Sequence, residues 1–327
     1  MTRYLLDSDR YRLVGPSAAV QEYGQRLASH PDSRTTECPC HGDRDSVVTE
    51  VDRYGLPCRL VICLECGLIR MNPAPTSSEL EWFYRHVYRA MYGPHEPTND
   101  RLFESKTWKG ELALTALTRA GVRIEGREVV DIGCGAGWTL SAFGRAASRV
   151  GYDYDEALLD LGRGRGFDLR RGGVEQALAD RRAFDIVICG HVLEHTPDPV
   201  EMLGALRALL TDDGFVYLEL PHLRRIAARL GCDALRYWQR AHLWDFDLEH
   251  VVALGKRAGL ERVWAGANRD SFFLVAARSE PAPEARVPRL GSEIAARLRT
   301  YERARSRPLH RTLRATTERI KHWLVRT

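Results

Sequence analysis

The sequence contains no hydrophobic run of the ~18 residues that a membrane-spanning helix needs, so we expect no transmembrane segment. Arg3 and Asp7 interrupt the N-terminus before the hydrophobic core of a secretory signal could form. No internal repeat is present, and 44% hydrophobic with 28% charged residues excludes a largely disordered chain. We therefore expect a folded cytoplasmic protein, with about two domains in 327 residues.

The chain has little net charge, and the excess is confined to its C-terminal end. Lys and Arg number 48 against 44 Asp and Glu, or +4, whereas residues 280–327 alone hold 12 against 5, or +7. The preceding residues therefore carry 4 − 7 = −3, which makes a nucleic-acid partner unlikely. In the tail, an apolar helical face predicts an amphipathic helix that packs on the body or binds an anionic membrane surface at the inner membrane face. This face consists of Leu309, Leu313, Ile320 and Leu324.

Composition divides the chain into five parts, each with a different local pattern. They are a polar, weakly helical segment (1–36), a cysteine-rich module (37–75), an aromatic-rich helical segment (76–121), a region of alternating strands and helices (122–279) and a basic tail (280–327).

The alternating region predicts the fold class, because short apolar runs alternate with helical patterns. Such runs are typical of a parallel sheet covered by helices on both faces, so we expect an α/β, Rossmann-like domain. The expected strands are 128–132, 149–153, 184–189, 215–219 and 271–277, and the expected helices are 138–147, one from 156, 199–210 and one from about 247.

A glycine-rich loop joins the first expected strand to its helix. Its sequence is Asp131-Ile-Gly-Cys-Gly-Ala-Gly137, and glycines at alternate positions allow a sharp turn and a close approach to a ligand. The N-terminus of the following helix would add free N–H groups. The second strand ends at Asp153, where a carboxylate can accept the two hydroxyls of a ribose. We therefore expect a nucleotide-like ligand at the carboxyl ends of these strands.

From Val129 to about Ala277 the sequence resembles the class I S-adenosylmethionine (SAM) dependent methyltransferases. The resemblance rests on the glycine loop, on Val150-Gly-Tyr-Asp153 and on the segment from Phe184 to His195. It implies a seven-stranded sheet, SAM as cofactor and residues near the adenine at 173–175, after the family's third strand. The SAM-binding residues that it implies are Asp131, Gly133, Cys134, Gly135, Gly137, Asp153, Tyr154, Val174, Glu175 and His191.

The residues after the fourth family strand indicate the acceptor chemistry. The Asn/Asp-Pro-Pro-aromatic signature of nucleic-acid and amide N-methyltransferases is absent, and the chain reads Cys189-Gly-His-Val192 there. Histidine titrates near neutrality and suits the removal of a hydroxyl proton. We expect His195 or His242 to be this base, with His222 and then Glu219 as weaker candidates, and His191 to shape the SAM pocket.

Five cysteines fall within 29 residues and predict a metal site, since thiols in a cytoplasmic chain stay reduced. Cys63-Leu-Glu-Cys66-Gly67 has the spacing of a zinc knuckle, and a hairpin would separate it from the first knuckle. We expect a closed, structural Zn²⁺ site formed by Cys38, Cys63, Cys66 and either Cys40 or His41.

The cysteine module and the aromatic segment after it resemble the N-terminal zinc-ribbon region of methyltransferases from bacterial polysaccharide and natural-product gene clusters. For the aromatic stretch we expect either a lid in which Tyr84, Tyr88 and Arg89 contact the acceptor or an aromatic row that belongs to the core. The predicted function is O-methylation of a glycan, sugar nucleotide or small metabolite. The alternatives are an RNA methyltransferase that uses the zinc module and basic tail, and a non-catalytic SAM-binding or scaffold protein.

Overall fold

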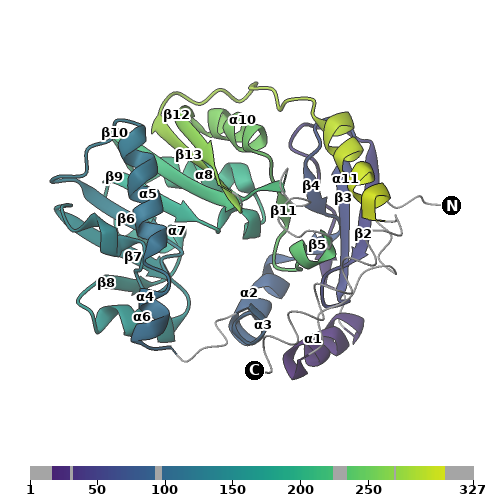
Figure 1. The fold of residues 1–327 in the computed structure, drawn as a ribbon, viewed down its shortest axis with the longest axis horizontal. Helices are drawn as coiled ribbons and strands as arrows, with labels where there is room; N and C mark the ends of the chain where they lie inside the picture. The colour runs from purple at the N-terminus through teal and green to yellow at the C-terminus, as the bar shows by residue number, and fades with distance from the viewer. Residues whose placement is uncertain (1–16, 30–31, 93–97, 224–233, 269, 306–327) are drawn as a thin grey trace. The chain divides into compact units, whose positions relative to one another are not determined.

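The computed structural model describes residues 17–29, 32–92, 98–223, 234–268 and 270–305, and the chain forms two compact units (Figure 1). The smaller unit comprises Met1–Ala74, Arg224–Arg240 and Arg289–Thr327, and the larger comprises Pro75–Leu223 and Ala241–Pro288. The predicted apolar face of the tail, residues 309–324, lies outside the described residues, as does Cys232. The five-part division of the sequence stays a prediction.

A seven-stranded sheet forms the centre of the larger unit, in the order β12-β13-β10-β9-β6-β7-β8. The five strands from β10 to β8 run parallel, and β13 pairs antiparallel with both β10 and β12. This arrangement confirms the predicted α/β, Rossmann-like seven-stranded fold. The strands are β6 (Glu128–Ile132), β7 (Ser148–Asp153), β8 (Asp168–Arg171), β9 (Phe184–Gly190), β10 (Leu210–Pro221), β12 (Leu260–Ala267) and β13 (Ser271–Arg278).

Helices flank this sheet, as Figure 1 shows for α5 and α10. The central strands have apolar middle segments because both faces are covered; Val129, Ile186 and Val187 are fully buried. None of the described helices is both long and apolar enough to cross a bilayer. The remaining elements of the unit are α2 (Ser77–His86), α3 (Tyr88–Tyr92), α4 (Asp100–Glu104), α5 (Trp108–Arg119), η2 (Leu140–Phe143), α6 (Glu156–Arg163), α7 (Val174–Ala179), η3 (Leu193–His195), α8 (Pro199–Ala208), β11 (Trp244–Asp245) and α10 (Leu248–Ala258).

The prediction of an α-helix at 138–147 is wrong, because only the short 3-10 helix η2 forms there. Two carbonyl oxygens that would continue an α-helix are bonded elsewhere. The Ser141 hydroxyl donates to the Trp138 carbonyl at 2.6 Å, and Nη1 of Arg149 donates to the Leu140 carbonyl at 3.3 Å. The glycine loop is therefore not followed by an α-helical N-terminus, and the contribution expected from helix N–H groups is missing.

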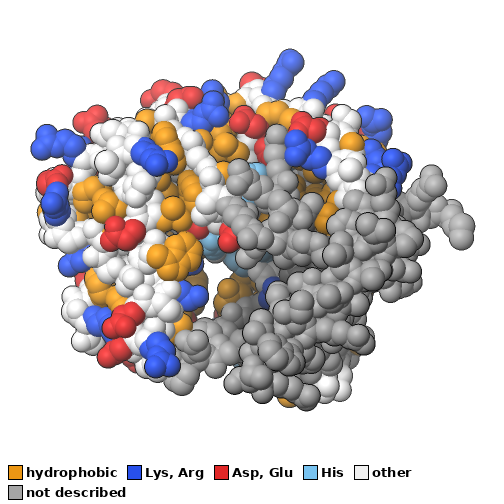
Figure 2. All heavy atoms as spheres, in the orientation of Figure 1, with side chains coloured by type: hydrophobic (Ala, Val, Ile, Leu, Met, Phe, Trp, Pro, Cys, Tyr) orange, Lys and Arg blue, Asp and Glu red, His pale blue; other side chains and the backbone are white. Residues whose placement is uncertain are grey.

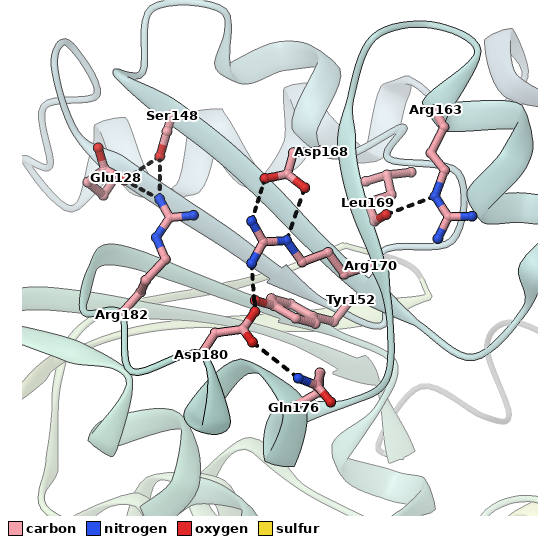
Figure 3. Close-up of polar contacts among 10 residues, drawn as sticks. All are labelled: Glu128, Ser148, Tyr152, Arg163, Asp168, Leu169, Arg170, Gln176, Asp180 and Arg182. Atoms are coloured by element: carbon pink, nitrogen blue, oxygen red, sulfur yellow. Dashed lines mark hydrogen bonds and ion pairs between the residues drawn. The ribbon is translucent and has the colours of Figure 1, made fainter.

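Charged side chains protect the edge strand β8, as Figure 3 shows. Arg170 pairs with Asp168 in its own strand at 2.9 Å and with Asp180 at 2.6 Å. Nε of Arg163 donates to the Leu169 carbonyl at 2.9 Å. Ion pairs and a bonded edge carbonyl prevent a further strand from adding to this side of the sheet.

The described face of the larger unit carries both signs of charge. Figure 2 shows Lys and Arg side chains interspersed with Asp and Glu over the part that carries α5 and α6. On this face there is no continuous basic surface of the kind that a polyanion requires.

The smaller unit is built on the predicted hairpin, with β2 pairing antiparallel to β3 and β3 to β4. Its C-terminal helix α11 packs on the loop after β3. The Leu290 amide donates to the Cys66 carbonyl at 3.3 Å, and the Gly291 amide donates to the Glu65 carbonyl at 3.0 Å. A Cβ at Gly291 would collide with the Leu64 carbonyl. The elements are α1 (Ala18–Ser29), β1 (Ser33–Arg34), β2 (Asp45–Val51), β3 (Pro57–Cys63), β4 (Ile69–Met71), η5 (Ala234–Tyr237) and α11 (Gly291–Arg305), with β5 (Ala74–Pro75) at the boundary between the units.

Candidate active site and cysteine centre

The glycine loop after β6 adopts a backbone that other residues would strain. Gly133, Gly135 and Gly137 have φ of 78°, 54° and 79°, in the left-handed region. A Cβ at Gly133 would collide with Val192, and one at Gly135 would collide with the Trp138 ring. The loop is thus folded as its sequence predicts, and its Gly133 lines a cavity at the ends of the central strands.

Asp153, at the end of β7, holds the glycine loop in place. Its Oδ2 accepts from the Gly135 amide at 2.8 Å, and its Oδ1 accepts from the Asp155 amide at 2.8 Å. Burial raises the pKa of Asp153 above its ordinary value, and these hydrogen bonds oppose that effect. Each carboxylate oxygen retains a second acceptor site, so the predicted ribose contact is compatible with this support role.

The residues predicted near the adenine lie beside Asp153. The Tyr154 hydroxyl donates to Glu175, and the Gly173 amide donates to the same carboxylate at 3.1 Å. Val174 begins α7 directly after Gly173. Tyr154 is 61% exposed, so its ring is available to a ligand.

The side chain of Cys134 points into the core, away from any ligand. It is 1% exposed and belongs to the apolar cluster between the sheet and its helices. A Cβ at Gly151 of β7 would come within 2.6 Å of its Sγ. Only the backbone of Cys134 could border SAM.

A small cavity of about 50 Å³ lies at the carboxyl ends of β6, β9 and β10. Asp131 in its wall is 2% exposed, and its Oδ2 has no hydrogen-bond partner among the described residues. Burial and then the charge of Asp153 raise the pKa of Asp131 well above its ordinary value. The cavity is lined by Lys109, Asp131, Gly133, Trp138, Thr139, Ile188, Gly190, His191, Tyr217 and Glu219.

His191, which we expected to shape the SAM pocket, lines the cavity and forms ion pairs with two buried carboxylates. Nδ1 lies 3.3 Å from Oε1 of Glu194, and Nε2 lies 3.2 Å from Oε1 of Glu219. Burial opposes its charge, yet the two carboxylates raise the pKa of His191 to about 9. Burial would raise the pKa of Glu194, but the contact with His191 and the nearby His195 and His242 lower it to about 2. His191 is therefore a cation at neutral pH.

His195 and His242, the two main candidates for the base, lie together. Their ring centroids are 4.8 Å apart in an edge-to-face arrangement. Nδ1 of His195 lies 2.8 Å from the carbonyl oxygen of Ala241. Since a carbonyl only accepts, Nδ1 carries the proton, and Nε2 of a neutral His195 holds the free electron pair. This is the state that a general base requires.

Two further hydrogen bonds fix the segments that carry these histidines. The Leu243 amide donates to the Glu194 carbonyl at 2.8 Å, and the indole of Trp244 donates to the Thr196 carbonyl at 2.8 Å. The two segments are thus held together by backbone hydrogen bonds as well as by the contact between their rings.

One ligand atom each from Glu194, His195 and His242 lies within 4.8 Å of the other two, a spacing that could hold a metal ion.

The aromatic segment before the sheet reaches the same histidine. The rings of Tyr84 and Tyr88 each lie edge-on to His195 with centroids 6.3 Å away. Arg89, one residue further on, pairs with Asp155 after β7. The helices α2 and α3 therefore contact both the candidate base His195 and the residues that follow β7.

His222 lies at the end of β10, outside the lining of the cavity. Its amide donates to the Asp270 carbonyl at 3.0 Å, and its ring lies edge-on to Phe272. Glu219, the other weaker candidate for the base, is held in the ion pair with His191, which lowers its pKa against the effect of burial.

The predicted cysteine centre contains four sulfur atoms within 4.8 Å of one another, those of Cys38, Cys40, Cys63 and Cys66. Adjacent sulfurs lie 3.4 to 3.5 Å apart. A tetrahedral zinc site with bonds of about 2.3 Å has sulfurs roughly 3.8 Å apart, so the group fits this metal. Of the two candidates for the fourth position, Cys40 joins the group and His41 does not.

Comparisons with known proteins bear on the larger unit. A family model described as a methyltransferase domain matches residues 106–268. Residues 106–268 form a class I SAM-dependent methyltransferase domain. This methyltransferase domain includes the glycine loop, the cavity and both candidate bases.

Relatives match the chain over part of its length. It is 33% identical over 104 residues to a ubiquinone biosynthesis O-methyltransferase of Actinobacillus pleuropneumoniae serotype 5b (strain L20), covering 28% of this chain and 44% of that protein. It is 38% identical over 108 residues to the protein of the same name from Pseudomonas aeruginosa (strain LESB58), covering 31% and 46%. The chain thus spans less than half the length of these curated relatives.

Among solved structures, the methyltransferase domain is similar to the magnesium protoporphyrin IX methyltransferase of Synechocystis PCC 6803 with bound S-adenosylhomocysteine. The identity is 20%, the TM-score is 0.44, and the match covers 61% of this chain and 95% of that chain.

Sequence reasoning missed Lys109, Thr139 and Tyr217, which line the cavity. Thr139 hydrogen-bonds Asp131. Lys109 and Tyr217 come from elements that only the fold brings to the glycine loop. Thr139 follows the loop directly but lies outside its glycine pattern. It also missed Glu194 as the partner of His191; the spacing of three residues on a turn was the available signal.

Proposed function

We propose that this protein transfers the methyl group of SAM to a hydroxyl of a glycan, sugar nucleotide or other small metabolite, with His195 as the general base. The observation that carries the proposal is the Nδ1–H···O hydrogen bond from His195 to Ala241, which leaves Nε2 as the basic atom. His242 packs against that ring and orients it. The O-methyltransferase names of the partial relatives are consistent with a hydroxyl acceptor.

The residues present fit SAM. The left-handed glycine loop forms a backbone cradle in which a Cβ at Gly133 or Gly135 would collide with the chain's own side chains. The buried Oδ2 of Asp131 lacks a partner among the described residues. The glycine loop would border the methionyl part, Asp153 the ribose, and Tyr154, Val174 and Glu175 the adenine. SAM supplies an electrophilic methyl group on a sulfonium. The chain's own residues orient the acceptor and remove its proton, which becomes favourable as the new bond forms.

Tyr84 and Tyr88 support an acceptor site at His195, because their rings stand at the edge of the same imidazole. Aromatic rings beside a base suit a ring-shaped acceptor bearing a hydroxyl. We propose that the sugar or metabolite ring of the acceptor binds beside His195, Tyr84 and Tyr88, with Arg89 as a further contact.

We also propose that Cys38, Cys40, Cys63 and Cys66 hold a structural Zn²⁺. Four protein ligands leave no open position for a substrate, so this ion would stabilise the smaller unit and take no part in methyl transfer.

The test combines binding with turnover. Calorimetry would measure S-adenosylhomocysteine binding to the wild type, Asp153→Ala and His195→Asn. Methyl transfer from labelled SAM would be measured on UDP-glucose, GDP-mannose and 3,4-dihydroxybenzoate. We expect Asp153→Ala to lose binding, and His195→Asn to bind normally but to lose roughly 10²–10⁴ in kcat.

His86→Asn is the matched control, since His86 is an exposed histidine on α2 whose Nδ1 also contacts a carbonyl, at 2.8 Å. It should keep its rate. Unchanged kcat in His195→Asn would refute the base assignment. A rate that falls on EDTA treatment while bound zinc is unchanged would instead assign Glu194, His195 and His242 to a second cation. Binding without turnover would favour a non-catalytic SAM-binding role.

A further inference from the structure

Glu194, His195 and His242 bring two imidazoles and one carboxylate together within the larger unit. One ligand atom from each lies within 4.8 Å of the other two. Oε1 of Glu194 is 3.9 Å from Nε2 of His195, the atom that the proposed reaction uses as its base. Two histidines and a carboxylate are a ligand set that binds Zn²⁺ and leaves a fourth position open. The group therefore has the composition of a metal site separate from the four cysteines.

Both histidines have the kind of neighbour that orients the ligands of a metal ion, which is a carbonyl or carboxylate on the other ring nitrogen. Nδ1 of His195 donates to the Ala241 carbonyl at 2.8 Å, so the electron pair of the neutral ring is on Nε2. Oδ1 of Asp245 lies 4.0 Å from Nδ1 of His242, and the Asp245 side chain is buried. The carbonyl and the carboxylate therefore leave one nitrogen of each ring for an ion.

The carboxylate of Glu194 also has an oxygen to offer. The residue is 1% exposed, and its Oε1 lies 3.3 Å from Nδ1 of His191. Its Oε2 has no hydrogen-bond partner among the described residues. A buried carboxylate oxygen without a partner is costly, and a bound cation would remove that cost. The positive charge of His191 opposes a second cation, so we expect an affinity well below that of four thiolates.

Zinc requires the three side chains to close slightly. Bonds of about 2.0–2.1 Å in a tetrahedron place the ligand atoms roughly 3.4 Å apart. Since Glu194 and His195 are 3.9 Å apart and no pair exceeds 4.8 Å, the atoms must approach by roughly 0.5–1.4 Å. Small rotations of the side chains supply such a movement.

We propose that Glu194, His195 and His242 form a regulatory Zn²⁺ site, and that the bound ion inhibits methyl transfer by occupying the electron pair on Nε2 of His195. A nitrogen that coordinates an ion cannot accept the proton of an acceptor hydroxyl. The site follows from the geometry of the three side chains, whereas the inhibition rests on the proposed function, in which His195 is the base.

The experiment titrates Zn²⁺ by calorimetry into the full-length wild type and its variants, with bound zinc counted by metal analysis. His195→Asn, His242→Asn and Glu194→Gln each remove one ligand, and Asp245→Asn removes only the charge beside His242. His86→Asn, at an exposed histidine of α2, controls for zinc on the surface. Circular dichroism checks that each variant is folded. Methyl transfer is measured with and without one further equivalent of Zn²⁺.

We expect the wild type and His86→Asn to bind one zinc ion more than each ligand variant, and Asp245→Asn to bind this ion roughly 10- to 100-fold more weakly. The added ion should lower the rate of the wild type, and a chelator should restore it. Equal zinc counts in the wild type and the folded ligand variants would overturn the site.

The inhibitory role has its own refutation. A further zinc ion that binds at these residues and leaves the rate unchanged, or raises it, would overturn the inhibition. A wild type without turnover would overturn the proposed function and the inhibition together, whereas the zinc count would still decide the site.

Discussion

The ion pair of His191 leads to a quantitative prediction about pH and stability. The folded pKa of His191 is about 9, above its ordinary value of 6.5. A raised pKa in a histidine means that the stabilisation is complete below pH 6.5 and is lost as the pH rises through about 9. One pH unit is worth about 1.4 kcal/mol, so protonated His191 contributes roughly 1.4 kcal/mol to the free energy of unfolding at pH 8 and about 0.1 at pH 10.

The perturbation is His191→Asn. His191 has a φ of 57°, and asparagine tolerates this left-handed backbone, so the substitution removes the imidazole without a large backbone penalty. Urea unfolding at pH 8 and pH 10 would give the free energies for the wild type and the variant. Because the Cys, Tyr and Lys groups that also titrate in this range are present in both proteins, their effects cancel. We expect the gap between wild type and variant to shrink by about 1.3 kcal/mol from pH 8 to pH 10.

A direct measurement accompanies the unfolding data. Proton NMR with ¹³C-labelled histidine would follow each imidazole, with His191 assigned by its absence from the variant. A gap that stays constant between pH 8 and pH 10, or an imidazole of His191 that titrates at or below 6.5, would refute the reasoning. His86→Asn serves as the control and should show no such change in its gap.

Three shorter predictions concern the glycine loop and the smaller unit. Gly135→Ala, in a left-handed backbone against a tryptophan ring, should abolish S-adenosylhomocysteine binding and cost roughly 2–4 kcal/mol, to be checked by calorimetry and urea unfolding; unchanged binding would contradict the cradle. Cys40→Ser should lose bound zinc by metal analysis while His41→Ala keeps it, and the reverse result would exchange their roles. Gly291→Val should clash with the Leu64 carbonyl, release α11 and expose it to limited proteolysis; an unchanged digestion pattern would show that α11 docks without this close approach.

The sheet could be predicted from the sequence because its strands are covered on both faces. Runs such as Ile186–Cys189 are apolar throughout, and glycine or aspartate marks their ends. The charged edge strand β8 and the half-exposed β12 were missed, since their side chains give no continuous apolar signal. The helix at 138–147 was overpredicted, because its carbonyls are captured by Ser141 and Arg149, and the latter lies beyond the segment.

Only some residues of the candidate site could likewise be predicted from the sequence. Residues within motifs, such as Asp131 and Asp153, were found because short-range spacing identifies them. Lys109 was not, because only the approach of α5 to the loop brings it to the cavity. The choice between Cys40 and His41 could be made only from the structure, since either residue is close enough to Cys38 in the sequence to bind the same metal ion.

The order of synthesis matters for the cysteine hairpin, because α11 packs on it. The hairpin leaves the ribosome before the larger unit, but the helix that covers its loop is made only after that unit, about 214 residues later (75 to 288). At 5–20 residues per second this interval lasts roughly 10–40 s. During that time the four thiols stand without their final cover, so binding of the metal that we propose for them competes with oxidation until α11 is made. The availability of zinc to the nascent chain would then determine how much of the protein matures.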